Sequence, residues 1–371
     1  MCKNPVFGLF SVESRLVLSW RMNQSENARR PYQPRSYCFM QTAQLDVKKA
    51  DAIDIFEPIQ AQLQQVEARM REMTVIAHPA LVSALQYLLQ SGGKRARPAV
   101  TLLTGDAMKA PEAALIDLAG AVELLHTASL VHDDIIDGAL LRRGVSTLNA
   151  TWSPGATILT GDFIFARAAQ LAAATGSVRV MSLFAQCLMT ICNGELNQLF
   201  EGRSGERERQ AYYDRIYAKT ASLFSLAGEA AAVLATDDEG VIAEMRRFGE
   251  KLGMAFQIVD DILDFVGKET AVGKPLGSDL RQGLVTLPTL YFLEQYPEDD
   301  RVVSVLNGHK RDPERLAQAL AAVRESEAIS LALAEARDFV NEARRSLRIM
   351  PASSQRDALE SLAEYIVARD L

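Results

Sequence analysis

A long stretch without proline, from Gly155 to Lys274, constrains the fold more than any other feature of this chain. Proline disrupts helix interiors, so its absence over such a length is typical of long helices. Alanine-rich runs at 166–174 and 227–235 fall in the same stretch. Upstream, apolar residues recur at steps of three and four, as one helix face requires; they are Ile53, Phe56, Ile59, Leu63, Val66 and Met70. Alternating strand patterns are absent, so we predict an all-α protein.

Composition and charge narrow the class of protein. Of the 371 residues, 48% are hydrophobic, which is ordinary for a globular fold and excludes global disorder. No uninterrupted run of about eighteen apolar residues occurs, so the sequence predicts no transmembrane helix. The formal net charge of −7 argues against binding to nucleic acid, which needs a basic surface. A local basic pocket for a small anion is compatible with this charge.

Residues 1–44 differ from the rest, and we expect them to form a disordered N-terminal extension. The first forty residues hold six basic and two acidic side chains and include Pro31 and Pro34. A transit peptide and an early start codon are the alternatives for this segment. No flexible linker divides residues 45–371, so we predict a single all-α domain of about ten or more helices there.

The strongest functional signal is an acidic motif that occurs twice. The sequence reads Asp-Asp-Ile-Ile-Asp at 133–137 and Asp-Asp-Ile-Leu-Asp at 260–264. Residues four apart share a helix face, so the outer aspartates of each motif project together. Carboxylates crowded on an apolar helix repel one another and need a compensating cation. One copy would indicate a solvated helix end, but two copies in apolar surroundings predict two halves of a metal site.

Carboxylate oxygens favour Mg²⁺, which takes one or two protein carboxylates and completes its shell with water and phosphate oxygens. The sequence also places cations beside the acidic motifs; they are Lys94, Arg95, Arg97, Arg142, Arg143, Lys219 and Lys274. Metal ions on one side and basic side chains on the others are typical of a diphosphate site.

Together these segments resemble the trans-polyprenyl diphosphate synthases, the isoprenoid chain-elongation family. The resemblance covers about residues 53–371 and rests on Gly-Gly-Lys-Arg-Ala-Arg-Pro at 92–98, Leu-Leu-His at 124–126, both acidic motifs, Arg-Arg-Gly at 142–144, Lys-Thr at 219–220, Phe-Gln at 256–257 and Gly-Lys-Pro at 273–275. It implies the isoprenoid synthase fold, a helical bundle around a central cavity, and usually a dimer. It also implies Mg²⁺-dependent condensation of isopentenyl diphosphate with an allylic diphosphate.

The resemblance assigns roles to the matching residues. The diphosphate of isopentenyl diphosphate would be bound by Lys94, Arg97, His126 and Arg143. The allylic diphosphate would be bound by Arg142, Lys219, Thr220, Gln257 and Lys274. The Mg²⁺ ligands would be Asp133, Asp137 and Asp260, supported by Asp264, and the catalytic set adds Lys219 and Arg142. Leu284 stands where many family members carry a lysine, which puts one allylic-diphosphate contact in doubt.

The expected reaction ionises the allylic diphosphate, because Mg²⁺ and cationic side chains stabilise the departing pyrophosphate. The allylic cation then alkylates isopentenyl diphosphate. Product length is expected to depend on Ala128 and Ser129, five and four residues before Asp133. In the family a bulky aromatic at the fifth position stops growth early, whereas Ala128 leaves the path open. We therefore expect a product of six to ten isoprene units for quinone side chains, with geranylgeranyl diphosphate as the alternative.

Two other interpretations are weaker. Terpene cyclases usually lack a second full acidic motif, and partner subunits of heteromeric synthases typically lose these motifs; both are intact here. The resemblance also implies a homodimer. We expect a cytoplasmic location, because the four cysteines, Cys2, Cys38, Cys187 and Cys192, have no zinc-site spacing and fit free thiols. A long lipid product implies transient membrane contact for release, although the sequence shows no amphipathic basic anchor.

Overall fold

The structure is a computed structural model that describes residues 55–72, 78–90, 95–142, 144–200, 208–267, 276–309 and 312–368. Residues 46–371 form one compact unit. The predicted N-terminal extension, residues 1–44, lies outside the described residues, and so do Lys94, Arg143 and Lys274.

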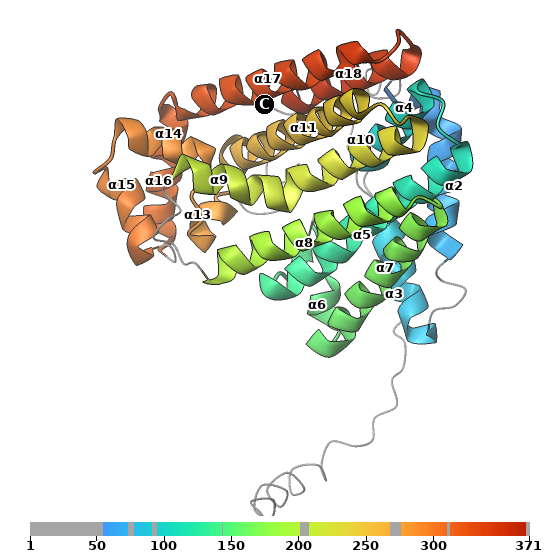
Figure 1. Ribbon diagram of the computed structural model, residues 1–371. Helices are drawn as coiled ribbons and strands as arrows, with labels where there is room; N and C mark the ends of the chain where they lie inside the picture. The colour runs from blue at the N-terminus through green and yellow to red at the C-terminus, as the bar shows by residue number, and fades with distance from the viewer. Residues whose placement is uncertain are drawn as a thin grey trace, which may run out of the picture. The chain divides into compact units, whose positions relative to one another are not determined.

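Helices make up nearly all the regular structure of the described residues, so the all-α prediction is confirmed (Figure 1). The N-terminal half contains η1 (Glu57–Ile59), α2 (Gln60–Arg71), α3 (Pro79–Gln90), α4 (Ala96–Ala107), α5 (Glu112–Ile136), α6 (Leu148–Thr151), α7 (Pro154–Ala174) and α8 (Val178–Phe200). The C-terminal half contains α9 (Arg209–Ile216), the π-helical turn η3 (Tyr217–Ala221), α10 (Ser222–Ala235), α11 (Glu239–Val266), α13 (Ser278–Gln282), α14 (Leu287–Gln295), α15 (Asp300–Ser304), η4 (Val305–His309), α16 (Pro313–Glu325), α17 (Ala328–Ser346), η5 (Leu347–Ile349) and α18 (Ser354–Ala368).

A short hairpin is the one regular element other than a helix among the described residues. Strands β1 (Leu141–Arg142) and β2 (Val145–Ser146) pair antiparallel, with Arg142 opposite Val145. Gly144 takes a φ of +74° between them, a conformation that glycine adopts without strain. The Tyr87 hydroxyl of α3 donates to the Ser146 carbonyl over 2.8 Å. The hairpin is thereby fixed directly after the first acidic motif.

Several helices begin where capping residues predict it. The Ser153 side chain accepts from the Ala156 backbone, and Pro154 follows at the first helical position of α7. Asp238 accepts from the first backbone N–H groups of α11. Asp312 does the same for α16. These local signals set the start of each helix, while packing decides which face is buried.

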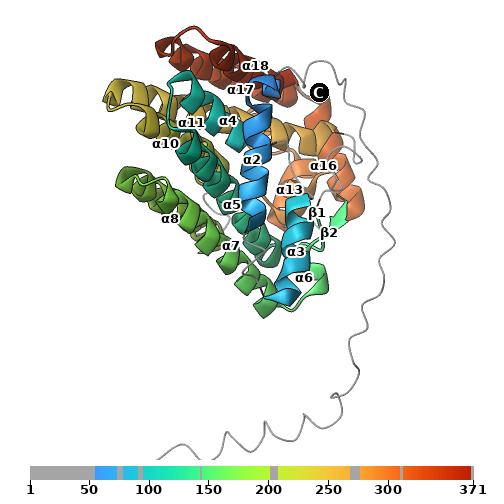
Figure 2. The same ribbon diagram turned by 90° about the vertical axis from the view of Figure 1, so that its right-hand side faces the viewer.

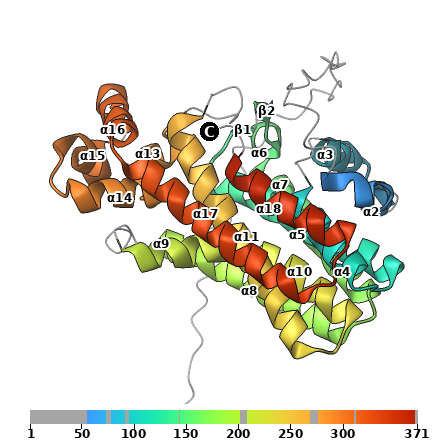
Figure 3. The same ribbon diagram turned by 90° about the horizontal axis from the view of Figure 1, so that it is seen from above.

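Helix α5 lies at the centre of the bundle. It packs most extensively against α7 and also contacts α2, α4 and α10. Figures 2 and 3 show that α17 and α18 lie over α11. By length and composition α5 is the one described helix apolar enough to cross a membrane, yet 61% of its apolar window is buried inside the protein. We therefore interpret it as a core helix, consistent with the charged motif at its end.

Glycines allow α10 and α11 to approach closely. A Cβ atom on Gly249 would lie 2.1 Å from the Phe224 carbonyl oxygen, and one on Gly253 would lie 2.5 Å from the Ala221 Cα atom. Real side chains do not tolerate such distances, so any larger residue must push the two helices apart. The close contact presses η3, the turn at the start of α10, against the second half of α11.

A second, smaller core holds the C-terminal helices α13 to α16 together. Its fully buried members include Phe265 from the end of α11, Leu280 from α13 and Phe292 from α14. The main core contains the inward faces of the long helices. The end of α11, which carries the second acidic motif, thus lies where the two cores join.

Candidate active site

The first acidic motif occupies the C-terminal end of α5. The Asp133 side chain is 13% exposed, whereas Asp137 is exposed and ends the helix, its backbone N–H donating to the Asp133 carbonyl over 2.8 Å. Gly138 follows with a φ of +62°, which turns the chain away. Because the helix stops here, the outer carboxylates stand at the edge of the bundle.

Asp134, the middle residue of this motif, is bound by the hairpin. Arg142 donates to Asp134 Oδ1 from Nε over 2.9 Å and lies 2.8 Å from it through Nη2. Asn149 Nδ2 donates to the Asp134 backbone carbonyl over 3.2 Å. Burial raises the pKa of Asp134, and the Arg142 hydrogen bond opposes that shift. Arg142, predicted to bind the allylic diphosphate, is therefore placed beside the motif by an ion pair.

Lys219 reaches the first motif from the π-helical turn η3. Its Nζ atom lies 3.8 Å from Asp133 Oδ2 and donates to Glu195 Oε1 over 2.8 Å. Burial raises the pKa of Asp133 to about 6, Lys219 opposes the shift, and the charges of Glu195 and Asp137 add to it. The pKa of Lys219 is also raised: its burial works against this, and the carboxylates outweigh it. Lys219 is thus a cation held between acidic groups.

Glu195 is a site residue that sequence reasoning missed. It lies on α8 with a side chain that is 14% exposed, four residues after the buried Ile191 and eight after the buried Cys187. A carboxylate that continues the buried face of an apolar helix is the signal that could have found it.

The neighbouring residue, Thr220, points to the second motif. Its hydroxyl donates to Gln257 Oε1 over 2.6 Å, and Gln257 Nε2 donates to Asp261 Oδ1 over 2.8 Å. The Tyr212 hydroxyl donates to Asp261 Oδ2 over 2.8 Å. Burial raises the pKa of Asp261 to about 8, with the charge of Asp279 adding to the shift. The predicted ligands Thr220 and Gln257 thus belong to one largely buried chain of hydrogen bonds. Tyr212 is a second residue that the sequence did not reveal.

The outer residues of the second motif differ in environment. Asp260 is half-buried, whereas Asp264 is completely buried. Asp264 accepts from the Ser278 hydroxyl over 2.8 Å and from the Asp279 backbone N–H over 3.0 Å. Both of its carboxylate oxygens therefore hold the start of α13. For Asp264, expected as a supporting metal ligand, the described contacts are structural.

Two predicted ligands of isopentenyl diphosphate are described. The Arg97 guanidinium, on the first turn of α4, lies 4.6 Å from the centre of the Phe224 ring, a cation–π distance. His126 is half-buried on α5, about two turns before Asp133. Arg95, two residues before Arg97, has a φ of +48° and donates to Glu123 over 2.7 Å. This pair ties the basic segment at 95–97 to α5.

The predicted length-determining residues lie on α5. Ala128 is completely buried, and Ser129 is half-buried with its hydroxyl donating to the His126 carbonyl over 2.9 Å. Leu284, found in place of a lysine, is half-buried directly after α13.

The acidic side chains fit a Mg²⁺ ion that shares its shell with a ligand. Among the described residues, no group of three or more His, Cys, Asp or Glu side chains forms a ready-made cage. Mg²⁺ needs only one or two carboxylates when phosphate oxygens and water complete its shell. The charges of Asp137 and Glu195 already disfavour ionised Asp133, a repulsion that a dication would relieve. The donors are oxygen atoms, as Mg²⁺ requires.

Comparison with known proteins identifies the family. Residues 78–323 match the polyprenyl synthetase family, so the chain belongs to it and is a prenyltransferase. The chain is 37% identical over 310 residues to heptaprenyl diphosphate synthase component 2 of Geobacillus stearothermophilus, covering 83% of this chain and 96% of that protein. It is 36% identical over 287 residues to octaprenyl diphosphate synthase of Haemophilus influenzae, covering 76% and 87%.

A solved structure supports the same assignment. The polyprenyl synthase of Caulobacter crescentus, complexed with calcium and isoprenyl diphosphate, superposes with a TM-score of 0.82 at 32% identity, covering 86% of this chain and 98% of that one. The predictions of an isoprenoid synthase fold and of a polyprenyl diphosphate synthase are confirmed. The roles of individual residues stay predictions.

Proposed function

We propose that the chain condenses isopentenyl diphosphate with an allylic diphosphate to make a polyprenyl diphosphate of six to ten isoprene units for quinone side chains. One observation carries the proposal: adjacent residues of one turn engage both acidic motifs. Lys219 lies 3.8 Å from Asp133, and Thr220 hydrogen-bonds to Gln257, one turn before Asp260. A cation and a hydroxyl between two carboxylate groups suit an anionic leaving group bound with divalent metal ions.

The residues divide the chemical tasks between them. Mg²⁺ bound by Asp133, Asp137 and Asp260 would neutralise the charge that develops on the departing pyrophosphate. Lys219 would donate to the same oxygens, and the Glu195 carboxylate, which accepts from its Nζ atom, holds the ammonium in place. Arg142, fixed by Asp134, adds a second cation. The pyrophosphate released in this step accepts the proton that the condensed product loses.

Arg97 and His126, with Lys94, are proposed to hold isopentenyl diphosphate. Arg97 has the rings of Phe224 and Phe256 on one side, with centres 4.6 and 5.9 Å from its guanidinium carbon. This apolar support orients the planar donor group and excludes water from it. Water exclusion matters because an allylic cation exposed to water is converted to an alcohol.

We propose a homodimer that forms through α7 and α8. Exposed apolar side chains of α8 lie along one stripe, because steps of eleven, seven and four residues return to nearly the same helix face. The stripe consists of Val178 (88% exposed), Met189 (57%), Leu196 (47%) and Phe200 (80%), and Leu159 of the adjacent α7 is 68% exposed. A soluble chain rarely leaves so much apolar surface uncovered. A second copy of this chain is the occupant we propose.

Assembly is tested by light scattering on the purified protein. A mass of two chains is expected, and Met189→Lys with Leu196→Lys should yield a monomer. Tyr296→Lys, which alters an exposed aromatic outside the stripe, should leave the dimer intact. The Geobacillus relative is named component 2, so a monomer that becomes active only with a different chain would favour a heteromer instead.

We further propose a cytoplasmic location. Cys187 is buried and Cys192 exposed, and both are free thiols. A protein that leaves an exposed thiol unpaired suits a reducing compartment.

One experiment tests the function directly. Purified protein alone is incubated with Mg²⁺, farnesyl diphosphate and labelled isopentenyl diphosphate, and the products are sized. Products of six to ten units are expected. A twenty-carbon product would favour the geranylgeranyl alternative, and no product without a second polypeptide would favour a partner subunit.

A further inference from the structure

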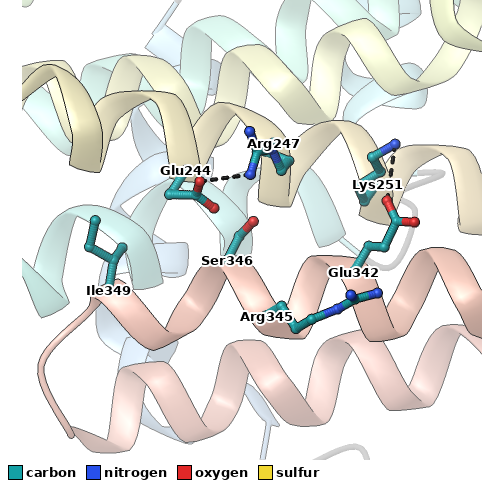
Figure 4. A pocket seen from close by; sticks show the side chains of 7 residues that line it. All are labelled: Glu244, Arg247, Lys251, Glu342, Arg345, Ser346 and Ile349. Carbon is teal, nitrogen blue, oxygen red and sulfur yellow. Dashed lines mark hydrogen bonds and ion pairs between the residues drawn. The ribbon is translucent and has the colours of Figure 1, made fainter.

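A groove between α11 and the C-terminal part of α17 is lined by charged residues unrelated to the diphosphate site. Figure 4 shows Arg247 and Lys251 of α11 facing Glu342 and Arg345 of α17, with Ile349 at one end. The groove has a volume of about 570 Å³. A second depression of about 460 Å³ shares Arg345 and is lined by Asn341, Arg344, Arg345, Arg348, Arg356 and Glu360.

Cations exceed carboxylates on this surface, which we name the α17 basic face. The cations that line the two depressions are Arg247, Lys251, Arg344, Arg345, Arg348 and Arg356, and the lining carboxylates are Glu244, Glu342 and Glu360. Two adjacent carboxylates also pair with these cations, Glu250 with Lys251 at 3.7 Å and Glu364 with Arg344 at 3.0 Å, so the cations exceed the carboxylates by one. The chain as a whole carries a formal charge of −7, so this face is basic on an acidic protein. Such a local reversal of charge is a feature of an anion-binding surface rather than of average composition.

The carboxylates of this face are already engaged by other cations. Glu244 pairs with Arg247 at 2.8 Å, Glu342 with Lys251 at 3.2 Å and Glu360 with Arg356 at 3.2 Å. Arg345 and Arg348 are exposed and form no ion pair with the residues that the structure describes. Arg345 donates from Nε to the Asn341 backbone carbonyl over 3.3 Å. Two guanidinium groups thus remain available to an external anion.

An exposed apolar side chain accompanies these cations. Ile349 follows Arg348 directly and is 44% exposed. Its side chain lines one end of the groove (Figure 4). Arginines beside an exposed aliphatic side chain suit an anionic membrane surface, because the cations contact headgroups and the apolar side chain contacts the interface. The exposed isoleucine would make no favourable contact with a small soluble anion.

The α17 basic face lies at the end of the bundle toward which the product grows. Lys219 and Thr220 bring the C-terminal ends of α5 and α11 together, so these helices run in the same direction. Glu244 lies about 24 Å before Asp260 along α11, at 1.5 Å per residue. A tail extending from Asp133 past Ala128 therefore advances toward the same end.

We propose that the α17 basic face docks the enzyme on membranes that contain anionic phospholipids. The proposal rests on the long-chain product proposed above, which is too apolar to leave through water. Docking by this face holds the growing end of the bundle against the bilayer. It requires neither a transmembrane segment nor a lipid anchor.

Vesicle binding tests the proposal with the full chain. Wild-type protein should sediment with vesicles of phosphatidylcholine and phosphatidylglycerol but not with pure phosphatidylcholine. Salt at about 0.5 M should release it, because salt screens the attraction between the cations and the anionic headgroups. The double variant R345E/R348E should partition roughly 30-fold less, or weaker still, because two cations near an anionic surface are lost. The single variant Ile349→Gln should bind vesicles more weakly than the wild type, with an unchanged salt dependence.

The control carries the same charge change elsewhere. R301E/R315E alters α15 and α16, at the far end of the bundle in Figure 1, and should bind vesicles like wild type. All variants should keep the helical circular dichroism and the turnover measured in detergent with farnesyl diphosphate.

Wild-type protein that ignores anionic vesicles, or R345E/R348E binding as tightly as wild type, would overturn the proposal. So would binding of a purified acidic protein, lost in R345E/R348E, without any vesicle binding. Failure of turnover in detergent would instead count against the proposed function, since that assay contains no bilayer.

Discussion

The Arg95 guanidinium donates to the Glu123 carboxylate over 2.7 Å and so joins the start of α4 to the middle of α5. Both side chains are largely buried, with exposures of 16% and 7%. Glu123→Ala should therefore reduce the free energy of unfolding by about 3–5 kcal/mol, because it leaves a buried guanidinium without its main partner. Arg97 lies two residues further on, so the KM for isopentenyl diphosphate should rise as well. Denaturant unfolding and steady-state kinetics measure both effects. Glu112→Ala, at an exposed position of the same helix, should change neither.

The acidic motifs can be tested by isosteric substitution. Asp133→Asn or Asp260→Asn should lower kcat by about a thousandfold or more, because stabilisation of the leaving group is the largest catalytic contribution. The helical circular dichroism should be retained. Asp264→Asn should behave differently: its carboxylate holds the start of α13, so the main loss should be in stability. Equal effects of Asp260→Asn and Asp264→Asn would contradict this division of roles.

Metal binding should depend on pH near 6. Burial raises the pKa of Asp133 from its ordinary value to about 6 in the metal-free protein. Only the ionised carboxylate binds Mg²⁺, so below pH 6 affinity should fall by up to about tenfold per pH unit, and above it the dependence should flatten. Calorimetric titrations at pH 6 in two buffers of different ionisation enthalpy should reveal proton release on binding. In Asp133→Asn the release should be smaller; an unchanged value would assign the proton to another group.

Product length should respond to Ala128. Ala128→Tyr is expected to shorten the product to about three or four isoprene units, because position 128 lies about 7.5 Å before Asp133 along α5. Condensation itself should survive, since the charged groups lie beyond it. Ala128 is completely buried, so the rival outcome is overpacking with a loss of about 1–3 kcal/mol. Mass spectrometry of products together with thermal unfolding separates the two. A destabilised enzyme with products of unchanged length would contradict the prediction that Ala128 lies on the path of the growing product.

The close contact between α10 and α11 at Gly253 should be sensitive to a single methyl group. Gly253→Ala places a Cβ atom 2.5 Å from the Ala221 Cα atom, so α10 must move away from α11. We expect a loss of stability of about 1–3 kcal/mol and a lower kcat, because Ala221 belongs to the turn that carries Lys219. Gly155→Ala is the control, since a Cβ atom there meets nothing within 4 Å. A Gly253→Ala protein with wild-type stability would show that α10 and α11 can separate at little cost in stability.

The sequence predicted the elements better than their contacts. Helical periodicity and the acidic motifs are local patterns, and they sufficed for the fold class and for the region of Asp133 and Asp260. Glu195 and Tyr212 escaped prediction because they act across the fold, from α8 and α9, where no motif marks them. The spacing places Asp264 on the same helix face as Asp260, as a supporting metal ligand, yet burial against α13 gives the two carboxylates different environments. The π-helical form of η3 was also not predicted, since periodicity does not distinguish one extra residue within a turn.

The extra residue of the π-helical turn η3 limits where this chain can tolerate a deletion. The turn Tyr217–Ala221 fixes the rotation of α9 relative to α10, and thereby aims Tyr212 at Asp261 while Lys219 and Thr220 face different helices. Removing one residue such as Ala218 would turn α9 by about 100° about its axis relative to α10. Every motif would still read correctly, yet the catalytic groups would no longer converge. The number of residues between Tyr212 and Thr220 is therefore as important to this site as the identity of those residues.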